Sequence, residues 1–268
     1  MKLNQHLVSA EWLNKNLNQN ELIVLDATIN KVITSQSTKI KNARFFDIKL
    51  KFSDTTARFP STVPSKEQFE NEARLLGINN NSVIVVYDDK GIYSSARVWW
   101  LFRLFGCKNI AVLDGGFPEW KKIKFEIENY DTQNFSLGDF KAKFNPEILI
   151  DFKGINDLKE KTNYQIIDAR SRERFDEKVD EPRKGLRRGK IPNSINLPYQ
   201  IILENGKLKT KEELIDIFTS LNIENKTLIF SCGSGITACI LALAFHIVGF
   251  KKYKIYDGSW TEYGTLTN

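Results

Sequence analysis

The sequence is poor in the residues that disulfide-rich and metal-binding proteins require. Its 268 residues include three cysteines and two histidines. The three cysteines (Cys107, Cys232 and Cys239) cannot form a disulfide framework, and they suit a reducing compartment. The two histidines (His6 and His246) are too few for a histidine-based metal cage. We therefore expect a cytoplasmic protein with no metal and no other cofactor.

Long apolar runs and a strong charge of one sign are missing as well. No stretch approaches the ~18 consecutive apolar residues of a membrane span, and residues 1–17 lack the apolar run of a signal peptide. The 39 basic and 33 acidic residues leave a formal charge of +6, which gives little support to nucleic-acid binding. The composition, 41% apolar and 27% charged, is that of a globular chain with a core. We expect no membrane and no nucleic-acid partner.

The sequence contains an internal repeat. Val24–Ala27 reappears as Ile166–Ala169, and Val112–Gly115 reappears as Ile255–Gly258. The offsets, counted between the aspartates of each pair, are 142 and 143 residues. A nearly shared offset at separated places indicates two copies of one domain. We place the first domain at 1–127, a polar linker at 128–146 and the second domain at 147–268.

Each copy alternates short apolar strands with helices. The predicted strands are 22–26, 82–87 and 111–113 in the first copy and 164–168, 227–230 and 254–256 in the second, with helices at 94–105 and from about 235 to 248. This order predicts an α/β fold with two tandem domains, each a mostly parallel sheet flanked by helices. Ligands of such sheets bind at the carboxyl ends of the strands. The loop after Phe230 is therefore the expected site.

That loop places a cysteine in a glycine-rich turn. Cys232 follows almost directly on the predicted buried strand 227–230 and precedes Gly233, Gly235 and the expected helix. Glycines let successive backbone N–H groups point inward as an anion-binding nest, and a helix N-terminus adds partial positive charge. Both effects favour the nucleophilic thiolate. Most lone cysteines are small buried hydrophobes, and we keep that interpretation for Cys107 and Cys239.

The sequence lacks the side chains that several kinds of cysteine site need beside the thiol, and their absence disfavours those kinds of site for Cys232. A cysteine protease needs a histidine base beside the thiol, but His246 lies about 16 Å along the predicted helix at ~1.5 Å per residue. A phosphatase of the Cys-x5-Arg kind needs arginine at position 238, where this chain has Ala238. Zinc would need further thiolate or imidazole ligands. A thiolate without a built-in base suits the capture of a sulfane sulfur.

The first copy offers an internal comparison. At the offset of 143 residues, Asp89 stands where the second copy has Cys232. A carboxylate cannot carry sulfur as a thiol does. We therefore expect the first domain to be catalytically silent.

Longer motifs resemble the two-domain rhodanese superfamily over roughly residues 7–264. They are Val98–Arg103, Leu113–Trp120, Gly189–Ser194 and Tyr256–Trp260, together with the cysteine loop. The resemblance implies two rhodanese-like domains and a sulfurtransferase in which Cys232 carries sulfur as a persulfide. It also implies a small sulfur donor and a thiol, a thioredoxin-like protein or cyanide as acceptor, and we expect a monomer.

The loop is similar to that of the mercaptopyruvate-using members. Thiosulfate-using members place Arg and Lys after the cysteine, where this chain has Gly233 and Ser234. Removing two cations weakens attraction for a dianion more than for a monoanionic keto acid. By resemblance, Gly233, Gly235, Ile236 and Thr237 also line the substrate site.

Two arginines are candidates for the keto acid itself. By resemblance, Arg174 and Arg183 match the pair that binds mercaptopyruvate, and guanidinium forks suit carboxylates. The alternative for either one is a solvated surface charge. Asp168 could order Arg174 or cap a turn. The basic run 183–190 could be read as a nucleic-acid patch, but no aromatic residue interleaves it for base stacking.

One position departs from the family. The resemblance implies a relay of Ser234 with an Asp and a His from the first domain, and Asp54 is the best match for the Asp, although it could be a turn residue. Ser61 stands where the His is expected. Either the relay is dispensable, or the protein is slower or prefers another donor.

We thus expect a 3-mercaptopyruvate sulfurtransferase acting through Cys232. Thiosulfate sulfurtransferase is the first alternative, and a non-catalytic rhodanese-like binding module is the second. A cysteine-based phosphatase or arsenate reductase is disfavoured by Ala238 and the short loop.

Overall fold

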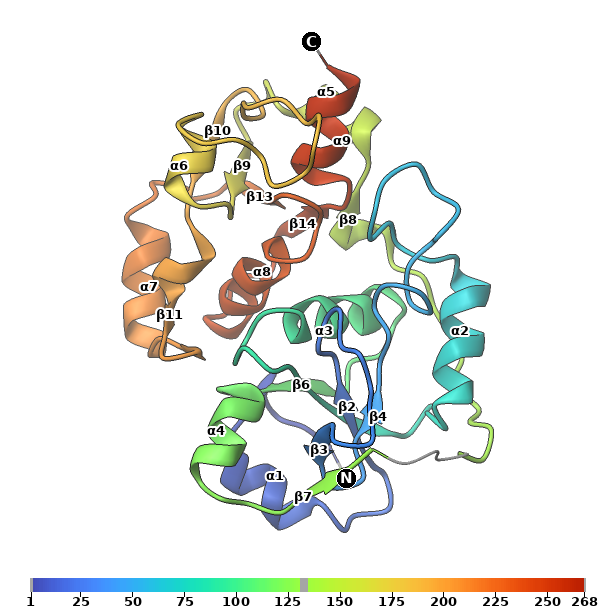
Figure 1. Cartoon of the computed structure of the whole chain (residues 1–268). Helices are drawn as coiled ribbons and strands as arrows, with labels where there is room; N and C mark the ends of the chain where they lie inside the picture. Colours follow the sequence, from blue (N-terminus) through green and yellow to red (C-terminus); the bar gives the residue numbers. More distant parts are fainter. Residues whose placement is uncertain (1, 131–134, 268) are drawn as a thin grey trace. The chain divides into compact units, whose positions relative to one another are not determined.

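The computed structural model describes residues 2–130 and 135–267, and the chain divides into two compact units. The first unit comprises Met1–Thr55, Val63–Asn145 and Asn205–Leu208, and the second comprises Thr56–Thr62, Pro146–Glu204 and Lys209–Asn268. Each unit therefore takes most of its residues from one half of the chain and a short segment from the other. Figure 1 shows the elements of both units in chain order.

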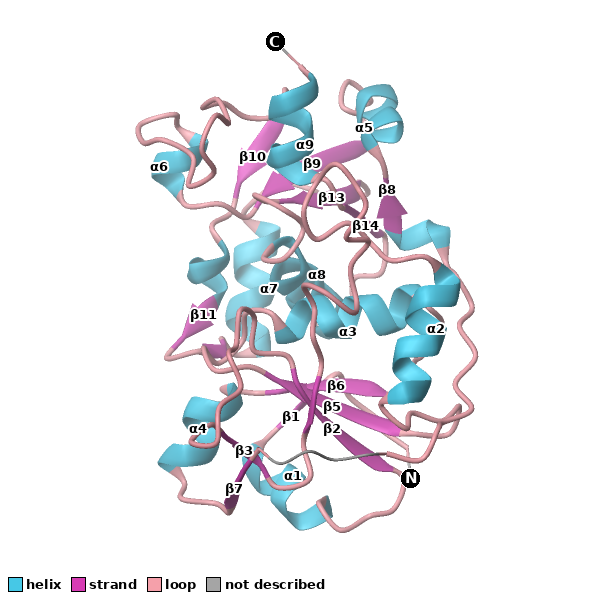
Figure 2. Ribbon diagram, turned by 45° about the vertical axis from the view of Figure 1, so that its right-hand side comes forward, coloured by secondary structure: helices cyan, strands magenta, loops and turns pink. Residues whose placement is uncertain are grey.

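The first unit is built on a five-stranded parallel sheet. Its strands run in the order β1 (Leu7–Val8), β6 (Ile110–Leu113), β5 (Val83–Tyr87), β2 (Leu22–Asp26) and β4 (Arg44–Phe45). One face carries α1 (Ala10–Asn16) and α4 (Gly116–Lys122), and the other carries α2 (Lys66–Leu75) and α3 (Ser95–Leu104) (Figures 1 and 2). The short strands β3 (Thr38–Ile40) and β7 (Ile127–Asn129) pair antiparallel.

Helices on both faces explain the continuous apolar runs of the central strands. Every residue of β5 is buried. Val83 and Val85 belong to one core cluster with Trp120 of α4, and the alternating Ile84 and Val86 point to the opposite face. Such runs carry no period-two signal, so their length and flanking turns identify them as strands.

The second unit repeats the plan. Its parallel strands run in the order β10 (Ser194–Asn196), β9 (Tyr164–Asp168), β13 (Thr227–Ser231), β14 (Tyr253–Tyr256) and β8 (Leu149–Ile150). The helices α5 (Phe152–Leu158) and α9 (Ser259–Leu266) cover one face, and α7 (Lys211–Thr219) and α8 (Ala238–Ile247) cover the other (Figures 1 and 2). The remaining elements are η1 (Pro146–Ile148), α6 (Arg172–Phe175), η2 (Tyr199–Ile202), β11 (Leu203–Glu204) and β12 (Lys207–Leu208).

The change from one unit to the other falls between Asn145 and Pro146. Before it, backbone N–H groups of Gly138 and Asn145 donate to carbonyl oxygens of the first unit at 2.9 and 2.7 Å. The predicted linker, 128–146, thus includes backbone that is hydrogen-bonded to the first unit. Its residues 131–134 lie outside the described residues.

The predicted fold class is confirmed, and the predicted strands appear within one residue at each end. The predicted start of the second helix is wrong. We expected it at about Gly235, but α8 begins at Ala238, because Gly235 has a left-handed φ of +74° that a helix cannot contain. Among the described residues, no helix has the length and apolar character needed to cross a membrane.

Candidate active site

The site begins where two neighbouring parallel strands end. Asp168, the last residue of β9, lies in register with Ser231, the last residue of β13. The loops that follow these strands therefore start side by side at one edge of the second sheet. Cys232 is the first residue after β13, and it is buried.

The hydroxyl group of Ser259 holds two N–H groups of residues 232–237, which we call the cysteine loop. The Oγ of Ser259 accepts hydrogen bonds from the N–H groups of Cys232 and Gly235, both at 3.1 Å. It donates to the carbonyl oxygen of Tyr256 at 2.8 Å, which leaves its lone pairs for the two N–H groups. The same oxygen lies 3.9 Å from the Sγ of Cys232. Ser259 therefore fixes the curl of the loop around the sulfur.

Four other N–H groups of the cysteine loop remain available. No described residue accepts a hydrogen bond from the N–H groups of Gly233, Ser234, Ile236 or Thr237. Unsatisfied N–H groups ahead of a helix make an anion-binding concavity. The nest is thus smaller than the sequence suggested, because Ser259 already takes the N–H groups of Cys232 and Gly235.

Both predicted arginines come to this loop. A Cβ atom placed on Gly233 would lie 3.0 Å from Nη2 of Arg174, so the guanidinium packs directly against that residue. Arg183 reaches the loop through Thr261, whose Oγ1 accepts from Nη1 of Arg183 at 3.4 Å and donates to the Gly233 carbonyl oxygen at 2.6 Å. The N–H of Thr261 donates to the same carbonyl at 3.0 Å.

Arg174 is the last of four charged side chains that pair one after another. Asp168 pairs with Arg170 at 2.7 Å, Arg170 pairs with Glu181 at 2.7 Å, and Glu181 pairs with Arg174 at 2.5 Å. Burial disfavours the charged form of Arg170, yet the carboxylates of Asp168 and Glu181 leave its pKa above the usual value. Asp168 holds Arg170 and Glu181 holds Arg174, so Asp168 reaches Arg174 only through Arg170 and Glu181. Asp168 also caps its turn, since its Oδ1 accepts from the N–H of Arg170 at 2.9 Å.

The relay residues lie in different parts of the chain. Ser234 is a half-buried member of the cysteine loop. Asp54 lies in the first unit, in the loop between β4 and α2, and its part in a relay stays a prediction. Ser61 belongs to the segment Thr56–Thr62 of the second unit, where it is buried with a φ of +61°.

The corresponding loop of the first unit, residues 88–94, is filled from within. The carboxylate of Asp88 accepts from the N–H groups of Lys90, Tyr93 and Ser95 at 2.8 to 2.9 Å. The expectation that Asp89 stands at the cysteine's position is wrong, because the structure places Asp88 there. Asp88 follows β5 directly, as Cys232 follows β13, and its carbonyl oxygen accepts from the N–H of Phe117 at 2.9 Å, as that of Cys232 accepts from Trp260 at 2.9 Å. Burial and the neighbouring Asp88 carboxylate raise the pKa of Asp89. We call this segment the aspartate loop. Its own side chain takes the N–H groups that a bound anion would use.

The two other cysteines have structural surroundings. Burial raises the pKa of the Cys107 thiol, which makes it a poor nucleophile. The Sγ of Cys239 donates to the Gly235 carbonyl oxygen at 3.3 Å from within α8. Both residues therefore contribute to packing.

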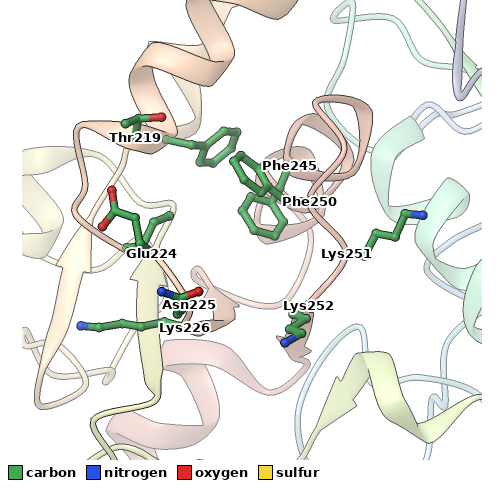
Figure 3. Close-up of a pocket in the computed structure, with 10 residues that line it drawn as sticks. Thr219, Glu224, Asn225, Lys226, Phe245, Phe250, Lys251 and Lys252 are labelled. Atoms are coloured by element: carbon green, nitrogen blue, oxygen red, sulfur yellow. The ribbon is translucent and has the colours of Figure 1, made fainter.

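A pocket of about 310 Å³ lies elsewhere in the second unit. Its lining includes residues 223–226 before β13 and 250–252 before β14, so it opens at the amino ends of the strands, away from the cysteine loop. Figure 3 shows the rings of Phe245 and Phe250 side by side in it, and their centroids are 4.7 Å apart. Its lining holds no cysteine or histidine: Phe218, Thr219, Ile223, Glu224, Asn225, Lys226, Phe245, Phe250, Lys251 and Lys252.

Sequence analysis gave no role to Ser259, Thr261, Arg170 or Glu181. A signal for Ser259 was available in the repeat, because the first copy has Gly116 at the same place. Both residues have a left-handed φ, +52° for Gly116 and +51° for Ser259. A serine costs about 1 kcal/mol or more in that conformation. Its presence there points to a needed hydroxyl.

The comparisons with known proteins agree with this geometry. The model of the rhodanese-like domain matches the chain twice, at residues 9–123 and 152–265. The chain belongs to the rhodanese family. The predicted membership and tandem repeat are confirmed.

Relatives of this rhodanese align over nearly its whole length. The mitochondrial thiosulfate/3-mercaptopyruvate sulfurtransferase 1 of Arabidopsis thaliana is 38% identical, over 97% of this chain and 76% of its own. The 3-mercaptopyruvate sulfurtransferase of Escherichia coli K12 is 36% identical, over 96% of this chain and 94% of its own. The crystal structure of SseA from Escherichia coli superposes with a TM-score of 0.84 at 34% identity, over 96% of this chain and 99% of that chain. The chain is therefore a sulfurtransferase of the rhodanese family.

Proposed function

We propose that this sulfurtransferase takes sulfur from 3-mercaptopyruvate, holds it as a persulfide on Cys232 and passes it to a thiol acceptor. The observation that carries the proposal is the pairing of an uncharged cysteine loop with two adjacent arginines. Gly233 and Ser234 bring no charge next to the sulfur, while Arg174 and Arg183 lie at the rim of the loop.

This distribution of charge suits a keto acid better than thiosulfate. A keto acid has one carboxylate, at the far end of the molecule from its thiol, and a guanidinium can donate two parallel hydrogen bonds to it. Thiosulfate concentrates two negative charges on a small group beside the reacting sulfur, and cations close to the thiolate would favour it. The cysteine loop offers N–H groups there and no cation.

The transfer needs one bond change at sulfur. The Cys232 thiolate attacks the thiol sulfur of mercaptopyruvate, an S–S bond forms, and the C–S bond breaks with its electron pair left on carbon. The resulting enolate takes up the proton of the former thiol and becomes pyruvate, which leaves Cys232 as an anionic persulfide. The N–H groups of the cysteine loop stabilise negative charge at this sulfur.

The second half of the reaction regenerates the thiolate. An acceptor thiolate attacks the outer sulfur, a new S–S bond forms on the acceptor, and the pair of electrons of the old S–S bond returns to Cys232. A small thiol or a thioredoxin-like protein can act as this nucleophile. Cyanide can also take the outer sulfur, and then a C–S bond forms in place of the new S–S bond and thiocyanate leaves. We propose a monomer for this cycle, since all the groups named belong to one chain.

Thiosulfate is the second candidate donor. Two observations favour it: a rat thiosulfate sulfurtransferase is 34% identical over 96% of this chain, and Ser61 stands where the mercaptopyruvate-using members have a histidine. The test compares kcat/KM for the two donors on one preparation. A mass increase of one sulfur on Cys232 after incubation with a donor reports the persulfide directly. A clear preference for thiosulfate would overturn the proposed donor, and no added sulfur with either donor would overturn the proposed carrier.

A further inference from the structure

We propose that Glu181 is a positioning residue that fixes the guanidinium of Arg174 for the carboxylate of the donor. The proposal deepens the function proposed above and rests on it for the identity of the donor. Glu181 binds one edge of the Arg174 guanidinium and leaves another edge open.

Glu181 occupies only half of the Arg174 fork. Its Oε2 accepts from Nη2 at 2.5 Å and its Oε1 accepts from Nε at 3.3 Å. No described residue accepts from Nη1 of Arg174. Because a guanidinium is planar and rigid, holding the Nε–Nη2 edge fixes the direction of the Nη1–Nη2 edge. That second edge is free to donate two parallel hydrogen bonds to a ligand carboxylate.

Glu181 is itself unable to turn. Its side chain is 1% exposed, and Oε1 also accepts from Nη1 of Arg170 at 2.7 Å. Arg170, whose side chain is fully buried, is held in turn by Asp168, by the Gly189 carbonyl oxygen at 2.9 Å and over the ring of Trp260. The side chain of Arg174 is 24% exposed, so it alone of the four charges meets solvent.

The two arginines of the site therefore do different things. Asp168 and Glu181 balance the charges of Arg170 and Arg174, so this group adds direction but no net charge. Arg183 pairs with no carboxylate among the described residues, and its recorded contact is the Thr261 hydroxyl. Arg183 thus supplies the attraction for anions, and Arg174, held by Glu181, supplies the geometry that a planar carboxylate needs.

The experiment separates geometry from charge with Glu181→Gln and a matched control, Asp180→Asn. Both variants remove one negative charge at neighbouring positions, but Asp180 is exposed and pairs with Arg188 at 2.9 Å. Two competitive inhibitors are titrated against whichever donor the wild type uses: pyruvate, a planar carboxylate, and sulfate, a dianion without a planar face.

We expect Glu181→Gln to raise the inhibition constant of pyruvate about tenfold or more, because small misplacements of a binding group cost this much. The inhibition constant of sulfate should equal the wild-type value or be lower, because the positive charge of Arg174 is then no longer neutralised by Glu181. Asp180→Asn should change both constants together, by less than about twofold. With mercaptopyruvate as donor, Glu181→Gln should raise KM more than it lowers kcat.

A double-mutant cycle tests whether Glu181 acts through Arg174. In an Arg174→Lys background, Glu181→Gln should leave the ratio of the pyruvate and sulfate constants unchanged. If Glu181→Gln does not fold, Glu181→Asp replaces it, because the shorter side chain keeps the charge but cannot span both arginines.

The ratio of inhibition constants decides the outcome. The positioning role would be overturned if the ratio of the pyruvate constant to the sulfate constant were the same in Glu181→Gln and Asp180→Asn. It would also be overturned if Glu181→Gln changed this ratio as much in the Arg174→Lys background as in the wild type. A wild type that prefers thiosulfate would overturn the proposed donor only, because the inhibitor ratio tests Glu181 with either donor.

Discussion

The Oγ of Ser259 lies 3.1 Å from the backbone nitrogen of Cys232 and 3.9 Å from its Sγ, although 27 residues separate the two in sequence. The hydroxyl holds the backbone of Cys232 and also lies near its sulfur. To do so, Ser259 adopts a φ of +51°, a conformation that glycine tolerates and serine does not. The backbone at position 259 is thus strained where its hydroxyl is used.

Two substitutions of Ser259 distinguish the effect of losing its hydroxyl from the effect of relieving its backbone strain. Ser259→Ala removes the hydroxyl that accepts from the N–H groups of Cys232 and Gly235, and the loss of such a hydrogen bond costs about 1–3 kcal/mol. We expect its free energy of unfolding to fall by about 2 kcal/mol or more and persulfide formation to slow at least about tenfold. Ser259→Gly loses the same hydroxyl but removes the strain, so it should be about 1 kcal/mol more stable than Ser259→Ala. Denaturant titration of both variants measures the difference, and the opposite order of stability would show that φ at this position costs nothing.

Cys232→Ser should abolish sulfur transfer and leave the fold intact. The exchange is nearly isosteric, but an alcohol ionises far less readily than a thiol. Cys107→Ser and Cys239→Ser are the matched controls, and both should keep their activity with at most a loss of stability. Turnover and the mass of each variant after donor incubation check this. Substantial turnover by Cys232→Ser would mean that the sulfur is carried elsewhere.

A single cation in the cysteine loop should shift the donor preference. Ser234→Lys places a charge beside the thiolate, and unit charges ~4 Å apart at an effective dielectric near 20 interact by about 4 kcal/mol before screening. We expect kcat/KM for thiosulfate relative to mercaptopyruvate to rise about tenfold, which needs only about 1.4 kcal/mol. An unchanged ratio in a folded, active variant would assign donor choice to Arg174 and Arg183.

Gly233→Arg should behave differently from Ser234→Lys. The φ of Gly233 is not in the left-handed region, so the backbone accepts a side chain, but its Cβ would lie 3.0 Å from Nη2 of Arg174. Two guanidinium groups repel one another at such a separation. We expect Gly233→Arg to displace Arg174 and raise KM for mercaptopyruvate, and addition of Ser234→Lys should increase thiosulfate use further. Kinetics of both donors with the two single variants and the double variant measure these effects, and an unaltered mercaptopyruvate KM in Gly233→Arg would contradict the first.

Thr261→Val tests the link between the cysteine loop and Arg183. Valine keeps the shape but loses the hydroxyl that donates to Gly233 at 2.6 Å and accepts from Arg183 at 3.4 Å. We expect a loss of about 1 kcal/mol in stability and a higher KM for anionic donors. Thr261→Ser keeps the hydroxyl and should retain most of the wild-type KM. Equal KM values in the two variants would show that the hydroxyl does not serve Arg183.

Much of the fold could be predicted because its signals are local. Strands such as Leu22–Asp26 and Tyr164–Asp168 are short apolar runs between turn residues, and the repeat marked them twice. The position of Cys232 followed in the same way, since it comes directly after such a strand. The start of α8 could not be predicted, because the turn at Gly235 has the same residue types as a helix N-terminus.

The hydrogen-bond and ion-pair partners of the site residues could not be predicted from the sequence. Ser259 meets the cysteine loop only because β13 and β14 are neighbours in the sheet. The pairing of Glu181 with Arg174, and of Asp168 with Arg170, depends on which of several nearby charges is turned inward. Spacing along the chain does not decide between such partners.

The Asp88 carboxylate in the aspartate loop bears on how a duplicated enzyme domain loses its activity. In the first copy Asp88 stands at the cysteine's position, and its carboxylate accepts from the N–H groups of Lys90, Tyr93 and Ser95. Asp88→Cys would therefore place a thiol at the cysteine's position and remove the carboxylate that these N–H groups bind, in one substitution. A single exchange at this position can therefore account for both the missing thiol and the filled loop.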